Sequence, residues 1–129
     1  MATILLIEND HETAHLVTGL LESRGHTISR AVSALEGLKM ARAIKPEIIL
    51  VEMSLPDIEG KVVVHQLRSY PGFQQIPIVA FADEANARAK RVALAFGCNE
   101  FISKPFNVHT FRDQIEMLMQ YFKHESREA

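Results

Sequence analysis

Short apolar runs alternate with longer amphipathic segments along the chain, and this alternation constrains the fold more than any other feature. Five runs have the length of β-strands: Thr3–Ile7, Thr27–Val32, Glu47–Val51, Ile76–Phe81 and Glu100–Ser103. The first, third and fourth are almost wholly apolar, as strands covered on both faces are. The second and fifth contain more polar residues, which is typical of sheet edges. Strands that alternate with helices predict an α/β fold with a parallel sheet.

The segments between the runs have helical periodicity and begin with capping residues. Asp10, Ser33, Asp83 and Asn107 each precede such a segment, and a side-chain oxygen at this position can accept a hydrogen bond from the first turn. Ser33 and Glu36 also have the spacing of a capping box. Helices are therefore predicted after the first, second, fourth and fifth runs.

The segment between the third and fourth runs is more ambiguous. Its three consecutive valines, residues 62–64, favour a strand, whereas Val63, Leu67 and Tyr70 fit one face of a helix. Because parallel neighbours need a crossover connection, we predict a helix from Gly60 to Tyr70.

The last helix is predicted to turn a regularly spaced set of apolar residues inward. Residues 123–129 after it are polar and are expected to form a frayed tail. The inward set is Val108, Phe111, Ile115, Leu118, Met119 and Phe122.

Five such units with right-handed crossovers predict a doubly wound five-stranded sheet in the flavodoxin-like order 2-1-3-4-5. The 129 residues suffice for one domain, which we assign to residues 1–122. Ligands of such sheets bind at the carboxyl ends of the strands, beside the point where strand order reverses. That rule selects seven candidate residues: Glu8, Asn9, Asp10, Glu52, Ala82, Asp83 and Lys104.

Composition narrows the class of function. The formal net charge is −2 and the basic residues are spread along the chain, which argues against a nucleic-acid-binding domain. No apolar run reaches the roughly 18 residues needed to cross a membrane. Met1 leads directly into a strand pattern without the charged region of a signal peptide, and Cys98 is the single cysteine. These features predict a cytoplasmic protein that binds neither nucleic acid nor membrane.

The acidic residues at the strand ends could hold a divalent cation, because Mg²⁺ prefers oxygen ligands. For Asp10 and Asp83, helix capping is the simpler role. Glu8 and Glu52 follow apolar strands directly, where an unpaired charge is costly. We therefore expect these two carboxylates to need a cation or Lys104.

The six histidines are interpreted as solvated surface residues. His11 and His15 have the i, i+4 spacing of a helical metal pair but no third partner at ligand spacing. Cys98 is interpreted as a small packed residue.

Four stretches resemble the motifs of response-regulator receiver domains. They are residues 4–10, Ile-Leu-Leu-Ile-Glu-Asn-Asp; residues 46–60, which end the third strand at Glu52 and close on Leu-Pro and Gly; residues 76–82 of the fourth strand; and residues 101–106, which contain Lys-Pro. The resemblance covers residues 3 to about 122 and implies the receiver fold. The stretch 97–105 is similar to single-domain receivers that act in cell fate.

The resemblance implies a role for each matching position. An aspartate at the position of Glu52 would accept phosphate from a histidine kinase, and Lys104 would pair with that phosphate. A hydroxyl at the position of Ala82 would follow the phosphate inward, and the aromatic residue at Phe101 would turn with it.

The resemblance also implies a Mg²⁺ site. Its family ligands correspond to Glu8, Asn9, Glu52 and the main-chain carbonyl of Ser54. Asn9 removes one formal charge from this set, so we expect Mg²⁺ to bind weakly or not at all and no other cofactor to be needed.

Three departures from the family pattern concern one mechanism. Glu52 is longer than aspartate by one methylene, about 1.5 Å, and enters the space of a phosphoryl group. Phosphoryl transfer tolerates displacement badly because positioning supplies much of its rate. Asn9 weakens the metal site, and Ala82 has no hydroxyl to report phosphate.

We therefore interpret the chain as a pseudo-receiver, a non-enzymatic adaptor of two-component phosphorelay signalling. Its protein partner, a histidine kinase or another signalling protein, would bind the face formed by the fourth helix, fifth strand and fifth helix. A working phospho-receiver with residual autophosphorylation at Glu52 or Asp10 stays open as the alternative. A nucleotide or flavin binder is disfavoured, because the loop after the first strand is acidic and lacks a phosphate-cradling glycine motif.

Two geometric expectations follow. The Glu52 carboxylate should lie within salt-bridge distance of Lys104, because an acid and an ammonium at adjacent strand ends need each other where solvent is limited. The peptide bond between Lys104 and Pro105 should be cis, as the resemblance implies.

Overall fold

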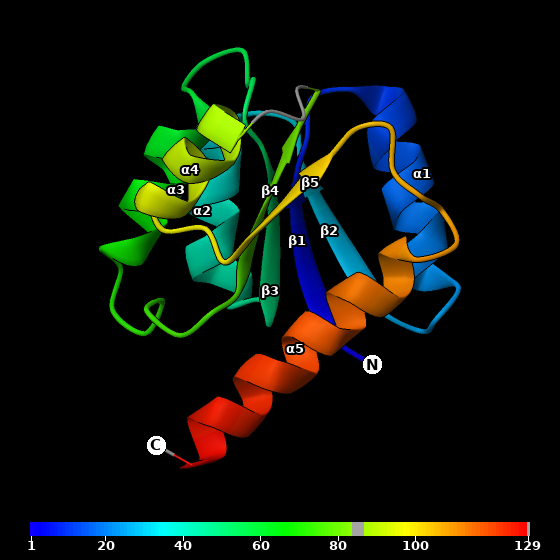
Figure 1. Cartoon of the computed structure of the whole chain (residues 1–129). Coiled ribbons are helices and arrows are strands. Elements are labelled where there is room, and N and C mark those ends of the chain that lie inside the picture. Colours follow the sequence, from blue (N-terminus) through cyan, green and yellow to red (C-terminus); the bar gives the residue numbers. More distant parts are fainter. Residues whose placement is uncertain (84–86, 129) are drawn as a thin grey trace.

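The fold is a single five-stranded parallel sheet in the order β2-β1-β3-β4-β5, as the sequence predicts. The computed structural model describes residues 1–83 and 87–128, and residues 124–128 only in backbone. The elements follow in strict alternation (Figure 1): β1 (Thr3–Ile7), α1 (His11–Glu22), β2 (Thr27–Ala31), α2 (Ala34–Ile44), β3 (Ile48–Glu52), α3 (Gly60–Arg68), β4 (Ile78–Ala82), α4 (Ala87–Ala95), β5 (Glu100–Ser103) and α5 (Phe111–Glu128).

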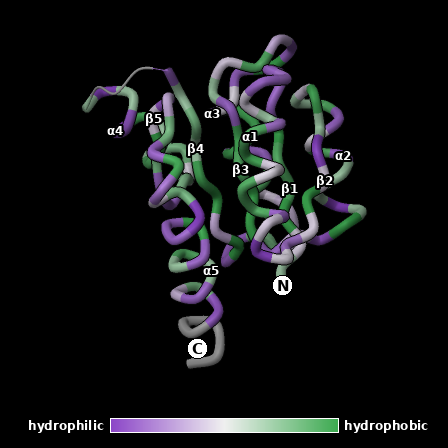
Figure 2. The backbone as a smooth tube through the Cα atoms, turned by 90° about the vertical axis from the view of Figure 1, so that its right-hand side faces the viewer, coloured by the Kyte–Doolittle hydropathy of each residue, from purple (hydrophilic) through white to green (hydrophobic). Residues whose placement is uncertain are grey.

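Helices cover both faces of the sheet and create two apolar layers. Helices α2, α3 and α4 lie on one face, and α1 and α5 lie on the other (Figure 1). Side chains of β1 and β3 alternate between the layers: Leu5 and Ile49 pack toward α2 and α3, whereas Ile4 and Ile48 pack toward α1 and α5. Figure 2 shows the central strands as mainly hydrophobic segments between helices of mixed colour. Burial on both faces explains why these strands are continuously apolar.

Two of the predicted helix caps are confirmed. The Asp10 carboxylate accepts a hydrogen bond from the Thr13 amide at 3.0 Å. The Ser33 hydroxyl accepts one from the Glu36 amide at 3.2 Å. The predicted helix from Gly60 is also present, so the need for a crossover outweighs the strand preference of its valines. The predicted cap at Asp83 would act on residues 84–86, which lie outside the described part of the chain.

Several predicted boundaries are wrong by one or two residues. Strand β2 ends at Ala31, and β3 and β4 begin at Ile48 and Ile78 and extend through Glu52 and Ala82. Pairing explains the later starts, because β3 takes its register from β1 and β4 takes its register from β3.

The last helix differs most from the prediction. A turn precedes it, in which the Asn107 side chain accepts from the His109 amide and the Asn107 carbonyl accepts from the Phe111 amide. Val108 therefore points away from the core and is 38% exposed, so its predicted inward position is wrong. Helix α5 continues to Glu128 and thus includes most of the segment that was predicted to be a tail, residues 123–129.

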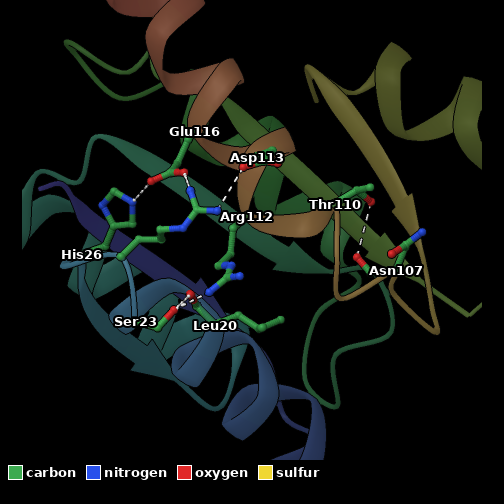
Figure 3. Close-up of polar contacts among 9 residues, drawn as sticks. Leu20, Ser23, His26, Asn107, Thr110, Arg112, Asp113 and Glu116 are labelled. Carbon is green, nitrogen blue, oxygen red and sulfur yellow. Dashed lines mark hydrogen bonds and ion pairs between the residues drawn. The ribbon is translucent and has the colours of Figure 1, made fainter.

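One histidine is buried, which contradicts its interpretation as a solvated residue. His26 follows α1 and is 8% exposed. Its Nδ1 accepts from the Ala2 amide at 3.1 Å, and its Nε2 lies 2.9 Å from Glu116 Oε2 on α5. Arg24 pairs with Glu116 and with Asp113. Figure 3 shows how side chains after α1 and on α5 face one another here, which fixes α5 against the amino-terminal end of the sheet.

Candidate functional site

Two buried carboxylates and one lysine meet at the carboxyl ends of the central strands. Glu8 follows β1 and its side chain is fully buried, and Glu52 ends β3 with a side chain that is 5% exposed. The Lys104 ammonium lies 2.9 Å from Glu8 Oε1 and 3.3 Å from Glu52 Oε1. The predicted pair between Glu52 and Lys104 is therefore confirmed, and the shorter contact of Lys104 to Glu8 is additional.

Backbone pairing places the lysine. The Lys104 amide donates to the Ala82 carbonyl at 2.8 Å, which extends the ladder between β4 and β5 by one residue. The bond between Lys104 and Pro105 is cis, as expected. On the other side, the Met53 amide donates to the Phe81 carbonyl at 2.9 Å and holds the chain after Glu52 against β4.

The electrostatics of this cluster are unbalanced, because one ammonium faces two carboxylates. Burial raises the pKa of Glu52, and the neighbouring charge of Glu8 raises it further, against the lowering effect of Lys104. Burial alone would lower the pKa of Lys104, but its hydrogen bond to Glu8 and the charges of Glu8 and Glu52 outweigh this and raise it. Glu52 Oε2 is buried and accepts no hydrogen bond from a described residue.

The other predicted site residues lie around this cluster rather than in it. Asn9, Ser54 and Asp83 are exposed, and Ala82 is partly buried beside the cluster. Asp10 is exposed, and hydrogen bonds from the Thr13 hydroxyl and amide lower its pKa.

Phe101 is partly buried at the end of the sheet next to α4. It pairs with Ala80 of β4 and packs against the apolar layer beneath α2, α3 and α4. Its contacts are those of a packing residue at the border of that layer.

A divalent cation fits this donor set poorly. The ammonium of Lys104 already contacts both buried carboxylates, and Asn9 offers an uncharged amide. Within residues 1–83 and 87–128, no group of three or more His, Cys, Asp or Glu is arranged to hold a metal ion. Mg²⁺ binding would require the lysine to move away from at least one carboxylate.

The two histidines of α1 do not form a metal site in this geometry. His11 and His15 are exposed and line a surface cavity of about 620 Å³. Arg30 Nη1 lies 2.9 Å from His11 Nδ1, so a cation already lies against this ring nitrogen. The electrostatics there oppose a second positive charge.

Asp57 is a residue near the site that the sequence analysis missed. Its carboxylate accepts from the Leu35 amide at 3.0 Å and from the Ala34 amide at 2.9 Å, and these bonds lower its pKa. The loop after Glu52 is thereby joined to the start of α2. The sequence shows an acidic residue, Asp57, after Leu-Pro, but the role of Asp57 as an acceptor depends on α2, which begins more than twenty residues earlier.

Gly60 is a second residue whose role emerges only in the structure. A Cβ atom there would lie 2.4 Å from the Glu52 carbonyl oxygen and 2.6 Å from Met53 Cα. Only glycine lets α3 begin this close to the backbone of the site. The Gly60 amide donates to the Met53 carbonyl at 2.9 Å.

An acid–lysine cluster at the strand ends of a 2-1-3-4-5 sheet defines the class of receiver modules, as the sequence motifs indicate. Comparison with protein families agrees: the response regulator receiver domain matches residues 4–116. The chain belongs to this family and is a receiver domain of two-component signalling.

Curated relatives are similar to this chain over most of its length. The polar-differentiation response regulator DivK of Brucella ovis is 29% identical over 88% of this chain and 93% of its own length. The transcriptional regulatory protein KdpE of Staphylococcus aureus is 29% identical over 93% of this chain. The chain spans about half the length of KdpE, 51%.

Solved structures agree with the fold. The chemotaxis response regulator CheY4 of Vibrio cholerae superimposes with a TM-score of 0.87 at 22% identity, over 92% of this chain and 98% of CheY4. NtrX of Brucella abortus gives a TM-score of 0.90 at 21% identity, over 98% of this chain and 28% of NtrX. No helix in the described part of the chain has the length and apolarity required to span a membrane.

Proposed function

We propose that this receiver domain acts as a protein-interaction adaptor in two-component signalling and does not depend on phosphorylation. One observation carries the proposal: Glu52 Oε1 lies 3.3 Å from the ammonium of Lys104. The carboxylate thus contacts the lysine that would otherwise pair with a phosphoryl group. Glu52 carries the same single negative charge as an unmodified aspartate and extends it by one methylene to the lysine.

The surroundings of Glu52 support this reading. A phosphoryl donor would have to approach a carboxylate that is 5% exposed and already paired. Ala82 has no hydroxyl to hydrogen-bond a phosphate. Mg²⁺ would have to compete with Lys104 for the two carboxylates, so we expect it to bind weakly.

The partner is proposed to be a histidine kinase or another signalling protein, bound on the face formed by α4, β5 and α5. This face carries exposed apolar side chains, among them Leu94 at 39% and Tyr121 at 58% exposure. Exposed apolar side chains can contribute contacts to an interaction surface. DivK, to which this chain is similar, is a polar-differentiation response regulator, which is consistent with a signalling role. We expect the protein to act in the cytoplasm.

Intact-mass spectrometry tests the proposal. The purified protein is incubated with acetyl phosphate and Mg²⁺ and compared with Glu52→Asp, which keeps Glu8 and Lys104. We expect no adduct of roughly 80 Da, one phosphoryl group, on the unmodified chain and a partial adduct on the variant. An adduct on the unmodified chain at Glu52 or Asp10 would establish the alternative, a working phospho-receiver.

Amide NMR tests the loss of the conformational response. With beryllofluoride, Glu52→Asp should change signals only near the site. Glu52→Asp combined with Ala82→Thr should also change signals around Phe101, because a hydroxyl is restored. One charge-assisted hydrogen bond contributes about 1.5–3 kcal/mol, a large part of what a population shift requires. Widespread changes across α4 and β5 in the single variant would contradict this account.

A further inference from the structure

Helix α4 carries a concentrated positive charge in a chain whose formal net charge is −2. Arg88, Lys90 and Arg91 lie within its nine residues, and none of these nine is acidic. All three side chains are exposed. We call these three residues the cationic α4 surface.

The cations of this surface form no ion pair with any residue that the structure describes. Other exposed cations do have partners: Arg24 pairs with Asp113 at 3.2 Å, and Lys61 pairs with Glu59 at 3.3 Å. Like charges spaced three residues apart on a helix repel each other. Arg88 and Arg91 have this spacing, so a bound anion would relieve the repulsion between them.

The basic residues of α2 provide an informative contrast. Lys39 has Glu36 three residues before it, and Arg42 lies 4.9 Å from the centre of the Tyr70 ring. Lys45 follows the helix at its carboxyl end, where the helix dipole favours a positive charge. Each of these cations is accommodated by the chain itself, whereas the cations of α4 have no ion-pair partner among the residues that the structure describes.

The packing of α4 also leaves it open to a partner. Ala93 is its only fully buried residue, and Leu94 is 39% exposed beside the cations. After the helix, Phe96 lies edge-on to His65 and 5.6 Å below the Lys61 ammonium. Lys61 and His65 of α3 thus lie beside the carboxyl end of α4.

We propose that the cationic α4 surface docks an acidic segment of a protein partner, with Leu94 as the apolar contact. This inference rests on the proposed adaptor function and specifies the chemistry of the partner. Complementary charge steers association and selects the partner. A membrane surface is disfavoured because Leu94 is the one large apolar side chain exposed on the described part of α4, whereas interfacial helices need a broad apolar face. Nucleic acid is disfavoured by the net negative charge.

Fluorescence anisotropy with a defined peptide tests the proposal. The probe is a short labelled amphipathic peptide in which glutamates flank leucines, and the control peptide has glutamine in place of each glutamate. We expect the acidic peptide to bind the full chain, with an affinity that falls as salt screens the charges. The glutamine peptide should bind at least about tenfold more weakly, since several charge pairs are lost.

Matched variants locate the binding surface. Arg88→Gln/Lys90→Gln/Arg91→Gln removes the cationic α4 surface, and Lys39→Gln/Lys45→Gln/Lys123→Gln removes the same charge elsewhere. The first variant should weaken binding about tenfold, and the second should change it less than about twofold. Circular dichroism of both variants verifies that each remains folded.

Three results would overturn the proposal. They are no binding of the acidic peptide, equal loss of binding in both triple variants, and tighter binding of a single-stranded oligonucleotide or of phosphatidylserine vesicles than of the peptide. None of these results depends on phosphorylation of the chain. A phosphoryl adduct on the unmodified chain would refute the adaptor proposal, whereas failure of the peptide experiment would refute only the chemistry assigned to α4.

Discussion

Lys104 is the counter-charge of both buried carboxylates, so its removal should destabilise the domain strongly. We consider Lys104→Met, which keeps the length of the side chain and removes the ammonium. The lysine side chain is 12% exposed and lies 2.9 Å from Glu8 and 3.3 Å from Glu52. Breaking a buried pair by removing one partner costs about 3–5 kcal/mol. Because Lys104 keeps some contact with solvent, we expect about 3 kcal/mol, a large share of the roughly 5–15 kcal/mol that stabilises a domain.

The loss should depend on pH. Burial and the charge of Glu8 already raise the pKa of Glu52 above its ordinary value of 4.5, and removal of Lys104 should raise it further. A carboxyl group with a raised pKa binds more protons in the folded than in the unfolded state. The free energy of unfolding therefore falls as the pH rises from 4.5 through the folded pKa. The loss of stability in Lys104→Met should therefore be smaller at about pH 5 than at about pH 8.

Urea unfolding followed by far-ultraviolet circular dichroism measures both effects. If Lys104→Met is too unstable to fold, the triple variant Glu8→Gln/Glu52→Gln/Lys104→Met provides a second measurement. This variant leaves no charge in the cluster of residues 8, 52 and 104, and it should recover most of the lost stability. A loss below about 1 kcal/mol near pH 8, as for an exposed pair, would refute the reasoning. An equal loss at both pH values would refute it as well.

Three further predictions concern Gly60, Arg68 and Cys98. Gly60→Ala should destabilise by about 3 kcal/mol in thermal unfolding, because its Cβ would overlap the Glu52 backbone, whereas the control Gly19→Ala, with open space, should stabilise by about 0.5–1 kcal/mol. Arg68→Lys should lower the unfolding temperature. The guanidinium donates to the carbonyls of residues 73, 76 and 97 and to the Asn99 side chain, and an ammonium cannot reproduce this set of hydrogen bonds. An unchanged melting curve would contradict this prediction. Burial raises the pKa of Cys98 to about 12, so iodoacetamide should modify it at neutral pH only as fast as the domain opens, and rapid labelling of the folded protein would show otherwise.

The sequence was sufficient to predict the sheet, its strand order and the meeting of Glu52 with Lys104. Continuous apolar runs and helical periodicity are local signals, and the right-handed crossover rule restricts how such units assemble. Residues that end neighbouring strands must then lie together at one edge. The segment that begins at Gly60 was predicted to be a helix, despite its three valines, from the same topological requirement rather than from local propensity.

Features that depend on distant partners were decided by the tertiary structure alone. His26 is buried because Glu116, ninety residues later, meets it on α5. Val108 is exposed because a turn at Asn107 delays the start of that helix. Local patterns carry no information on either contact.

The balance of charge at the site was also decided by the tertiary structure. The sequence predicted that Glu8 and Glu52 need a cation or Lys104, but it named only the pair between Glu52 and Lys104, whereas the lysine lies closer to Glu8, at 2.9 Å. Which of two nearby acids a lysine approaches depends on side-chain packing within a few tenths of an ångström. That packing arises only when the carboxyl ends of β1, β3 and β5 are brought together at one edge of the sheet.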